Sequence, residues 1–221
     1  MDKISLAMNI AEKLPVLVVS PEMSADQMTN RLVGAVGRID PSNLTTGQLT
    51  EDEWGMLSEA INTLHQAPIE IHDAGVHTMS AIRSVAKHAK NQHKKLGLIV
   101  VDYLQFIDSS EDDADENRAA EAGNICRGLR LLAKELECPV LALSQLNRKL
   151  ESRTDKHPIM SDLRDSGSIE LGTDIVAFVY RDDYCTKEAF KTPSVAKIIL
   201  TKQSNSCTAS RTIFNLAWQA V

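Results

Sequence analysis

Six short runs rich in Val, Ile and Leu are spread along the chain, and they constrain the fold more than any other feature of the sequence. The runs are "PVLVVS" (15–20), "IEIH" (69–72), "GLIVVD" (97–102), "PVLALS" (139–144), "DIVAFVY" (174–180) and "VAKIILT" (195–201). Several of them are apolar throughout, which is typical of central strands covered on both faces. We therefore predict a β-strand at each run.

Segments of helical length separate most of these runs. Residues 78–95 and 116–137 repeat apolar residues with a period near 3.6, and Thr78 or Ser80 can cap the first of them. An amphipathic stripe over residues 3–14 opens the chain. Strands that alternate with helices need crossover connections, which predicts an α/β fold with a mainly parallel sheet flanked by helices. The last two runs lack a long intervening helix, which predicts a C-terminal antiparallel extension.

The size and composition of the chain narrow the possible classes of protein. With 221 residues and 43% hydrophobic content, we predict a single domain over residues 1–221. The formal net charge of −6 argues against a general nucleic-acid coat, although it leaves room for a narrow basic channel. The sequence shows neither an apolar run near the ~20 residues that span a bilayer nor a signal peptide. The four scattered cysteines lack C-x-x-C spacing, which predicts free thiols and a cytoplasmic protein.

Acidic and amide side chains follow three of the predicted strands. Asp102 closes one apolar run, Glu22 follows another by two positions, and Gln145 comes directly after a third. Because parallel α/β sheets bind ligands at the carboxyl ends of their strands, these residues are candidates for a nucleotide site. An aspartate after a buried strand is the pattern of a Walker B residue that holds Mg²⁺, and a nearby glutamate can activate a water. The alternative is that all three only accept hydrogen bonds from nearby backbone N–H groups.

Several segments follow one another in an order that resembles one known family. They are "SPEMSADQMTNRL" (20–32), "TGQLTEDEW" (46–54), "LIVVDYLQFI" (98–107), "LAKELECPVLALSQLNR" (132–148), "LALSQLNRKLESR" (141–153), "SDLRDSGSIE" (161–170), "YRDDY" (180–184) and "LTKQSN" (200–205). This set resembles the hexameric bacterial replicative DNA helicases, the DnaB family, over practically the whole chain. The resemblance implies the C-terminal RecA-like ATPase domain of these helicases, a P-loop NTPase fold.

The resemblance also implies roles for the residues at the nucleotide. Glu22 matches the catalytic glutamate that activates the lytic water, and Asp102 matches the Walker B aspartate that holds Mg²⁺ on ATP. Gln145 matches the glutamine that links the γ-phosphate to the DNA-binding loops. Arg31 lies where the family has an arginine near the nucleotide, and Lys202 matches the lysine of the neighbour-facing motif.

A further loop matches the part of the family that touches DNA. Arg164, Asp165 and Gly167 match residues whose side chains and backbone groups contact phosphates of single-stranded DNA. Such contacts are independent of base sequence and sensitive to salt. The resemblance implies a hexameric ring around single-stranded DNA, with primase or a loader as further partners and no membrane.

The family pattern breaks at the start of the chain. In the family, the helix at 3–14 directly follows the P-loop, G-x-x-x-x-G-K-[ST], whose backbone amides bind phosphates. Here Lys3 stands at the position of the P-loop lysine, Asp2 replaces a glycine, and Ile4 replaces the Ser/Thr that binds Mg²⁺. We therefore expect a chain truncated at the Walker A motif, lacking the first strand, the P-loop, the N-terminal collar domain and its linker, with impaired binding of ATP and Mg²⁺.

A second break lies in "KQSNS" (202–206), where the family reads K-Q-R-N-G. Lys202 remains, but Ser204 replaces the arginine finger that reaches the nucleotide of the adjacent subunit. An arginine finger contributes ~10³–10⁵ in rate, and a serine hydroxyl carries no charge to replace it. We therefore expect catalysis to be impaired at this neighbour-facing motif as well.

Three hypotheses remain open at this point. The first is the motor domain of a replicative helicase that couples ATP hydrolysis to translocation on single-stranded DNA and duplex unwinding. The second is a catalytically impaired remnant that at most binds DNA or intact helicase subunits. The third, a recombinase of the RecA type, shares the core fold, but "SDLRDSGSIE" (161–170) favours the helicase branch.

Overall fold

The computed structural model describes residues 14–75, 77–107, 118–147, 150, 153–163, 166–181, 195–203 and 212–217. The chain divides into two compact units, residues 1–114 with 128–143 and residues 115–127 with 144–220. The elements are β1 (Val16–Val19), α2 (Ala25–Gly37), α3 (Pro41–Thr46), α4 (Glu51–Gln66), β2 (Ile69–His72), α5 (Met79–His93), β3 (Leu98–Val101), η1 (Leu104–Phe106), α6 (Arg118–Leu136), β4 (Val140–Ala142), η3 (Met160–Asp162), α7 (Ser166–Gly172), β5 (Ile175–Arg181), β6 (Val195–Gln203) and β7 (Thr212–Ala217).

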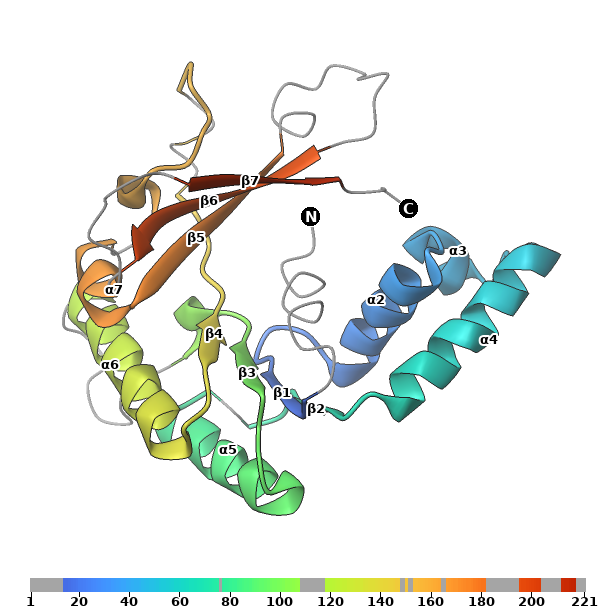
Figure 1. Cartoon of the computed structure of the whole chain (residues 1–221), viewed down its shortest axis with the longest axis horizontal. Helices are drawn as coiled ribbons and strands as arrows, with labels where there is room; N and C mark the ends of the chain where they lie inside the picture. The colour runs from blue at the N-terminus through green and yellow to red at the C-terminus, as the bar shows by residue number, and fades with distance from the viewer. Residues whose placement is uncertain are drawn as a thin grey trace. The chain divides into compact units, whose positions relative to one another are not determined.

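Four parallel strands form the sheet of the first unit, in the order β2-β1-β3-β4 (Figure 1). Val101 of β3 pairs with Val19 of β1 on one side and with Ala142 of β4 on the other, so these three strands end at the same level. β1 and β3 are buried along their whole length. The prediction of a mainly parallel sheet with fully apolar central strands is confirmed.

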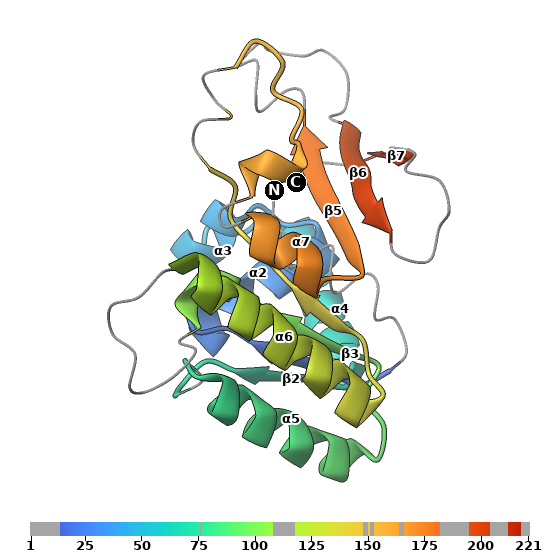
Figure 2. The same cartoon turned by 90° about the vertical axis from the view of Figure 1, so that its left-hand side faces the viewer.

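Helices cover both faces of this sheet. On one face Val18 and Val100 join Met28 and Leu32 of α2 in a single apolar cluster, and Leu64 of α4 packs against it. Successive side chains of a strand point to opposite faces. The intervening residues of β1 and β3, which are fully buried, therefore face the other side, where α5 and the part of α6 from residue 128 lie (Figure 2).

Side-chain caps fix where the outer helices begin. The Thr50 hydroxyl accepts a hydrogen bond from Glu53 N (3.3 Å), and the Glu53 carboxylate accepts one from Thr50 N (2.8 Å), which is a complete capping box at the start of α4. Of the two residues able to cap α5, Thr78 does so, because its hydroxyl accepts from Ala81 N (3.2 Å). The observed bounds of α5 and α6 lie within the predicted segments 78–95 and 116–137.

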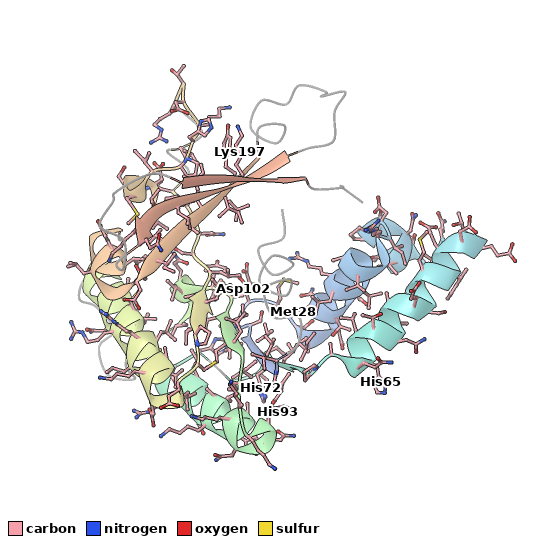
Figure 3. All side chains as sticks on the ribbon, viewed as in Figure 1. Met28, His65, His72, His93, Asp102 and Lys197 are labelled. Carbon is pink, nitrogen blue, oxygen red and sulfur yellow. The ribbon has the colours of Figure 1, made fainter. Side chains whose placement is uncertain are left out.

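The edge strand β2 carries a carboxylate between two imidazoles. Glu70 Oε1 lies 2.6 Å from His72 Nε2 on the same strand, and Glu70 Oε2 lies 3.3 Å from His93 Nε2 at the end of α5. Figure 3 shows His72 and His93 near each other. This cluster joins the last turn of α5 to the edge of the sheet.

The second unit contains an antiparallel sheet in the order β5-β6-β7. Tyr180 of β5 pairs with Lys197 of β6, and Ile198 of β6 pairs with Phe214 of β7. The predicted antiparallel extension is confirmed. The sequence analysis did not assign a strand to residues 212–217, which form β7.

A polar network holds the loop that precedes α7 in the second unit. Asp162 is 5% exposed, and its carboxylate accepts hydrogen bonds from Arg153 Nη1 (3.1 Å) and Ile159 N (2.8 Å). The Arg153 guanidinium also donates to the carbonyls of Asp155 (3.1 Å) and His157 (2.6 Å). The long segment 147–170 therefore contains ordered structure at 153–163 and a helix from 166.

Candidate active site

The connectivity of the first unit identifies one end of its sheet as the place for a ligand. The chain passes from β1 to β2 on one side and then returns to β3 on the other side of β1. In open α/β sheets, ligands bind outside the carboxyl ends of the strands at such a reversal of direction. The candidate site is therefore the end of the sheet where β1 and β3 both terminate.

Glu22 lies in the turn that leaves β1 at this end. Ser20 is fully buried, and its backbone N–H donates to His72 O (2.9 Å), which extends the pairing of the strands by one residue. The Ser20 hydroxyl accepts from Met23 N (3.1 Å), which closes a tight turn before α2. Asp73 Oδ2 accepts from Ala25 N (2.7 Å) in the first turn of that helix. Glu22 is exposed at the tip of this turn.

Asp102 directly follows β3 at the same end of the sheet (Figure 3). Its backbone N–H donates to Val19 O (2.9 Å), and its exposed fraction is 9%. The peptide bond between Asp102 and Tyr103 is cis. The next residues turn into η1, where Leu104 N donates to Leu143 O (2.9 Å). Asp102 is therefore held by the backbone of the central strands.

The charges of both carboxylates act on Tyr103. Burial raises the pKa of the Tyr103 phenol above its usual value, and the negative charges of Glu22 and Asp102 raise that pKa further. Both carboxylates therefore act on the same phenol, from the ends of adjacent strands. The Tyr103 ring packs edge-to-face against Phe106, with 4.7 Å between ring centroids.

The donor set at this end of the sheet suits Mg²⁺ carried on phosphate. Among the residues that the structure describes, His, Cys, Asp and Glu side chains form no group of three or more able to hold a metal ion. Mg²⁺ normally binds through one or two carboxylates together with substrate phosphates and waters. Asp102 supplies such an oxygen, so the residues present fit a magnesium–nucleotide complex better than a metal held by protein alone.

The remaining predicted residues of the nucleotide and DNA sites fall in three places. Arg31 lies on the exposed side of α2 in the first unit. Gln145 and Gly167 are both exposed and belong to the second unit, so their meeting with Glu22 and Asp102 stays a prediction. Lys3, Arg164 and Asp165, together with Ser204, lie outside the described residues.

Lys202, predicted to lie near a nucleotide, is engaged with α7 in the second unit. Its ammonium group donates to the carbonyl oxygen of Glu170 and to that of Thr173 (2.7 Å). A cation at the end of a helix stabilises the unpaired carbonyls there. These contacts give Lys202 a structural role, while its nucleotide role stays a prediction.

The sequence analysis missed Tyr103 and Asp73 at this end of the sheet. Tyr103 directly follows Asp102 and Asp73 directly follows β2, so their position after apolar runs was the available signal. Their partners, the two carboxylates and the N–H of Ala25, come from other strands and helices.

Comparisons with known proteins decide the family. The profile of the DnaB-like helicase C-terminal domain matches residues 1–220. The chain belongs to the DnaB-like helicase family. It is 47% identical to the replicative DNA helicase DnaB of Geobacillus stearothermophilus over 204 residues, covering 91% of this chain and 44% of that protein. It is 45% identical to the replicative DNA helicase DnaC of Bacillus subtilis, with the same coverage of both chains. The chain thus spans less than half the length of these curated relatives.

Solved structures of similar proteins share the fold. A DnaB-like replicative helicase, described with its interactions with primase, superposes with a TM-score of 0.86 at 30% identity, covering 96% of this chain and 51% of that one. A second solved structure, described as an ATPase domain, superposes with a TM-score of 0.86 at 31% identity, covering 98% of this chain and 77% of that one. The RecA-like ATPase fold implied by the sequence is confirmed. Among the described helices, none combines the length and apolar character that crossing a bilayer requires.

Proposed function

We propose that this chain is the motor part of a DnaB-type replicative helicase, which couples ATP hydrolysis to movement along single-stranded DNA and to duplex unwinding during replication. The proposal is supported by the position of Glu22 and Asp102, which follow the adjacent parallel strands β1 and β3 at one end of the sheet, in a chain of this family. The names of its relatives as replicative DNA helicases support the same reaction.

The two carboxylates take different roles because their surroundings differ. Asp102 is 9% exposed and fixed by backbone hydrogen bonds, which suits a residue that holds a cation in one position. Glu22 is exposed at the tip of a turn, which suits a residue that accepts a proton from water and passes it to solvent. Bound ATP with Mg²⁺ supplies the phosphoanhydride that is hydrolysed. The charges of both carboxylates act on the phenol of Tyr103.

The other predicted residues complete this proposal. Gln145 would sense the γ-phosphate, and Lys3, Arg31 and Lys202 would bind the nucleotide. Arg164, Asp165 and Gly167 would contact DNA phosphates. We further propose that residues 1–221 act as one cytoplasmic motor domain, assembled as a hexameric ring with copies of itself or with intact helicase subunits. The solved relative described with primase supports primase as a partner; a loader is proposed from the family resemblance.

ATP hydrolysis by the purified chain, measured with Mg²⁺ and with or without a single-stranded oligonucleotide, tests the proposal. Glu22→Gln removes the proton acceptor, and we expect turnover to fall by ~10²–10⁴. Glu59→Gln is the matched control, since it makes the same change at an exposed glutamate of α4. Turnover that is indistinguishable between Glu22→Gln and Glu59→Gln would refute the assignment.

A second candidate function rests on the departures from the family pattern. Asp2, Ile4 and Ser204 stand where the family resemblance places a glycine, a Ser/Thr and the arginine finger. A chain impaired in this way would act at most as a DNA-binding or helicase-binding module. This second function predicts that ATP turnover is absent. It also predicts either salt-sensitive binding of a single-stranded oligonucleotide or mixed oligomers with intact helicase subunits. Turnover abolished by Glu22→Gln would exclude this second function.

A further inference from the structure

One guanidinium group closes the loop at residues 153–163 of the second unit. Arg153 Nη1 donates to Asp162 Oδ1 (3.1 Å), and Arg153 Nη2 lies 3.1 Å from Asp162 Oδ2, which is a two-point fork between guanidinium and carboxylate. The same guanidinium donates to the carbonyls of Asp155 and His157, earlier in the loop. Arg153 therefore joins the beginning of this loop to its end.

Asp162 also joins the loop to the segment that follows Gln145. The Asp162 carbonyl accepts a hydrogen bond from Asn147 N (2.7 Å), and Leu146 forms an antiparallel bridge with Leu163. Asp162 and Leu163 are only 5% and 6% exposed, so water competes poorly with these contacts. The two segments are thus held in one register.

Contacts with the antiparallel sheet hold the same loop. The His157 ring stacks on Tyr180 of β5, with 4.4 Å between ring centroids and 31° between ring planes. The Thr201 hydroxyl of β6 donates to Met160 Sδ (3.2 Å). The loop is therefore fixed to β5 and β6 as well as by its own fork.

Residues assigned to DNA and nucleotide stand next to this register in the sequence. Arg164 directly follows Leu163, and Gln145 directly precedes Leu146. The Arg153 guanidinium already donates to a carboxylate and to two carbonyls, which leaves it poorly suited to bind a phosphate itself. Its place in the fold suits the positioning of neighbouring residues instead.

We propose that Arg153 and Asp162 are positioning residues for DNA binding. Their fork sets the register between the segment after Gln145 and the segment before Arg164, without touching DNA. This inference rests on the proposed function and deepens it, since it names the residues that hold the DNA-binding segment in place. It also has a consequence opposite to that of charge alone. Asp162→Asn removes a negative charge, which by itself strengthens binding to DNA phosphates, whereas loss of the fork weakens it.

Fluorescence anisotropy of a labelled single-stranded oligonucleotide, titrated with the full chain at fixed salt concentration, tests this role. We expect Asp162→Asn and Arg153→Lys each to raise Kd at least about fivefold. A lysine keeps the charge but cannot form the fork, so a direct phosphate contact by Arg153 would largely survive Arg153→Lys. Asp174→Asn is the matched control, since it makes the same change at an exposed carboxylate of the second unit, and its Kd should not exceed the native value. A Kd for Asp162→Asn no higher than that of Asp174→Asn, or a native Kd for Arg153→Lys, would overturn the proposal.

Thr50→Ala separates positioning from a general loss of stability. This change removes a helix cap in the first unit and lowers stability there. With all proteins folded at the assay temperature, as circular dichroism reports, Thr50→Ala should keep the native Kd. An equal rise in Kd for Thr50→Ala and Asp162→Asn would overturn the positioning role.

Hydrogen exchange without DNA or nucleotide tests the register directly. The Asn147 amide, bonded to Asp162 O, should exchange at least about tenfold faster in Arg153→Lys than in the native chain. The Ile82 amide of α5, bonded to Thr78 O, is the internal control and should be unchanged. Unchanged exchange at Asn147 would overturn the proposal. Failure of the native chain to bind the oligonucleotide would instead refute the DNA-binding part of the proposed function, on which this inference rests.

Discussion

Removal of the Asp162 carboxylate should loosen the loop that precedes α7. In the native chain this carboxylate accepts from Arg153 Nη1 (3.1 Å) and Ile159 N (2.8 Å), and its side chain is 8% exposed. Asp162→Ala leaves both donors without their acceptor in a site that water reaches poorly. The change therefore removes charged hydrogen bonds and leaves an unsatisfied N–H group behind.

The expected loss of unfolding free energy depends on how exposed each partner of the Asp162 carboxylate is. A hydrogen bond to a charged group contributes ~1.5–3 kcal/mol. The Arg153 side chain is 32% exposed and keeps its donations to the carbonyls of Asp155 and His157, so water compensates part of its loss. We expect Asp162→Ala to lower the free energy of unfolding by about 2–3 kcal/mol. Arg153→Met should cost about 1–2 kcal/mol, since Asp162 then retains the Ile159 N–H group.

Urea denaturation followed by circular dichroism measures these changes. With a slope of about 2 kcal/mol per molar urea, Asp162→Ala should lower the midpoint by roughly 1–1.5 M. The double variant should cost less than the sum of the single variants, because both remove the same contact. Asp26→Ala, at an exposed carboxylate of α2, is the control and should stay within about 0.5 kcal/mol of the native chain. An Asp162→Ala midpoint equal to that of the control contradicts the reasoning.

Further predictions concern a cap, a helix end and two thiols. Thr50→Ala removes the acceptor of Glu53 N and should cost about 1 kcal/mol of unfolding free energy in urea, whereas Thr50→Ser should cost a few tenths. Lys202→Met removes the cation from the end of α7 and should lower Tm by about 2–4 °C; an unchanged Tm would show that these contacts contribute nothing. Burial raises the pKa of the Cys126 and Cys138 thiols, so iodoacetamide at pH 8 should label both slowly in the native chain and rapidly in urea. Because the folded pKa of each thiol is raised, its contribution to the free energy of unfolding is fully present below the unfolded pKa of about 8.5 and is lost as pH rises through the folded pKa. Urea midpoints measured at about pH 7.5 and 9.5 would reveal this loss.

The central strands β1 and β3 could be predicted because burial on both faces leaves a continuous apolar run. β7 could not, because "TIFNLA" (212–217) includes polar residues at Thr212 and Asn215 and lacks such a run. Its position is fixed by antiparallel pairing with β6, which no local pattern encodes. The cap of α5 shows the same limit, because Thr78 and Ser80 are equivalent in sequence and only the path of the backbone selects Thr78.

The position of the candidate site could be predicted as far as the topology of the sheet determines it. Glu22 and Asp102 could be assigned to the same end of the sheet because parallel strands bring their carboxyl ends to one edge. The influence of both carboxylates on Tyr103 was not predictable, because it depends on how the turns after β1 and β3 fold. The structural contacts of Lys202 were equally hidden, since its partners lie about thirty residues away in sequence.

The carboxylate of Glu70 between His72 and His93 has a consequence for the solubility of the chain. A β-sheet can recruit a foreign strand along any margin whose backbone groups are unpaired, and inward-pointing charges deter such recruitment. Because β2 carries the Glu70 carboxylate, backbone-mediated aggregation of the parallel sheet is disfavoured on that margin. Among the described strands of the parallel sheet, the opposite edge is β4, with the uncharged sequence "VLA". Addition of a foreign strand to this sheet would therefore have to start at β4.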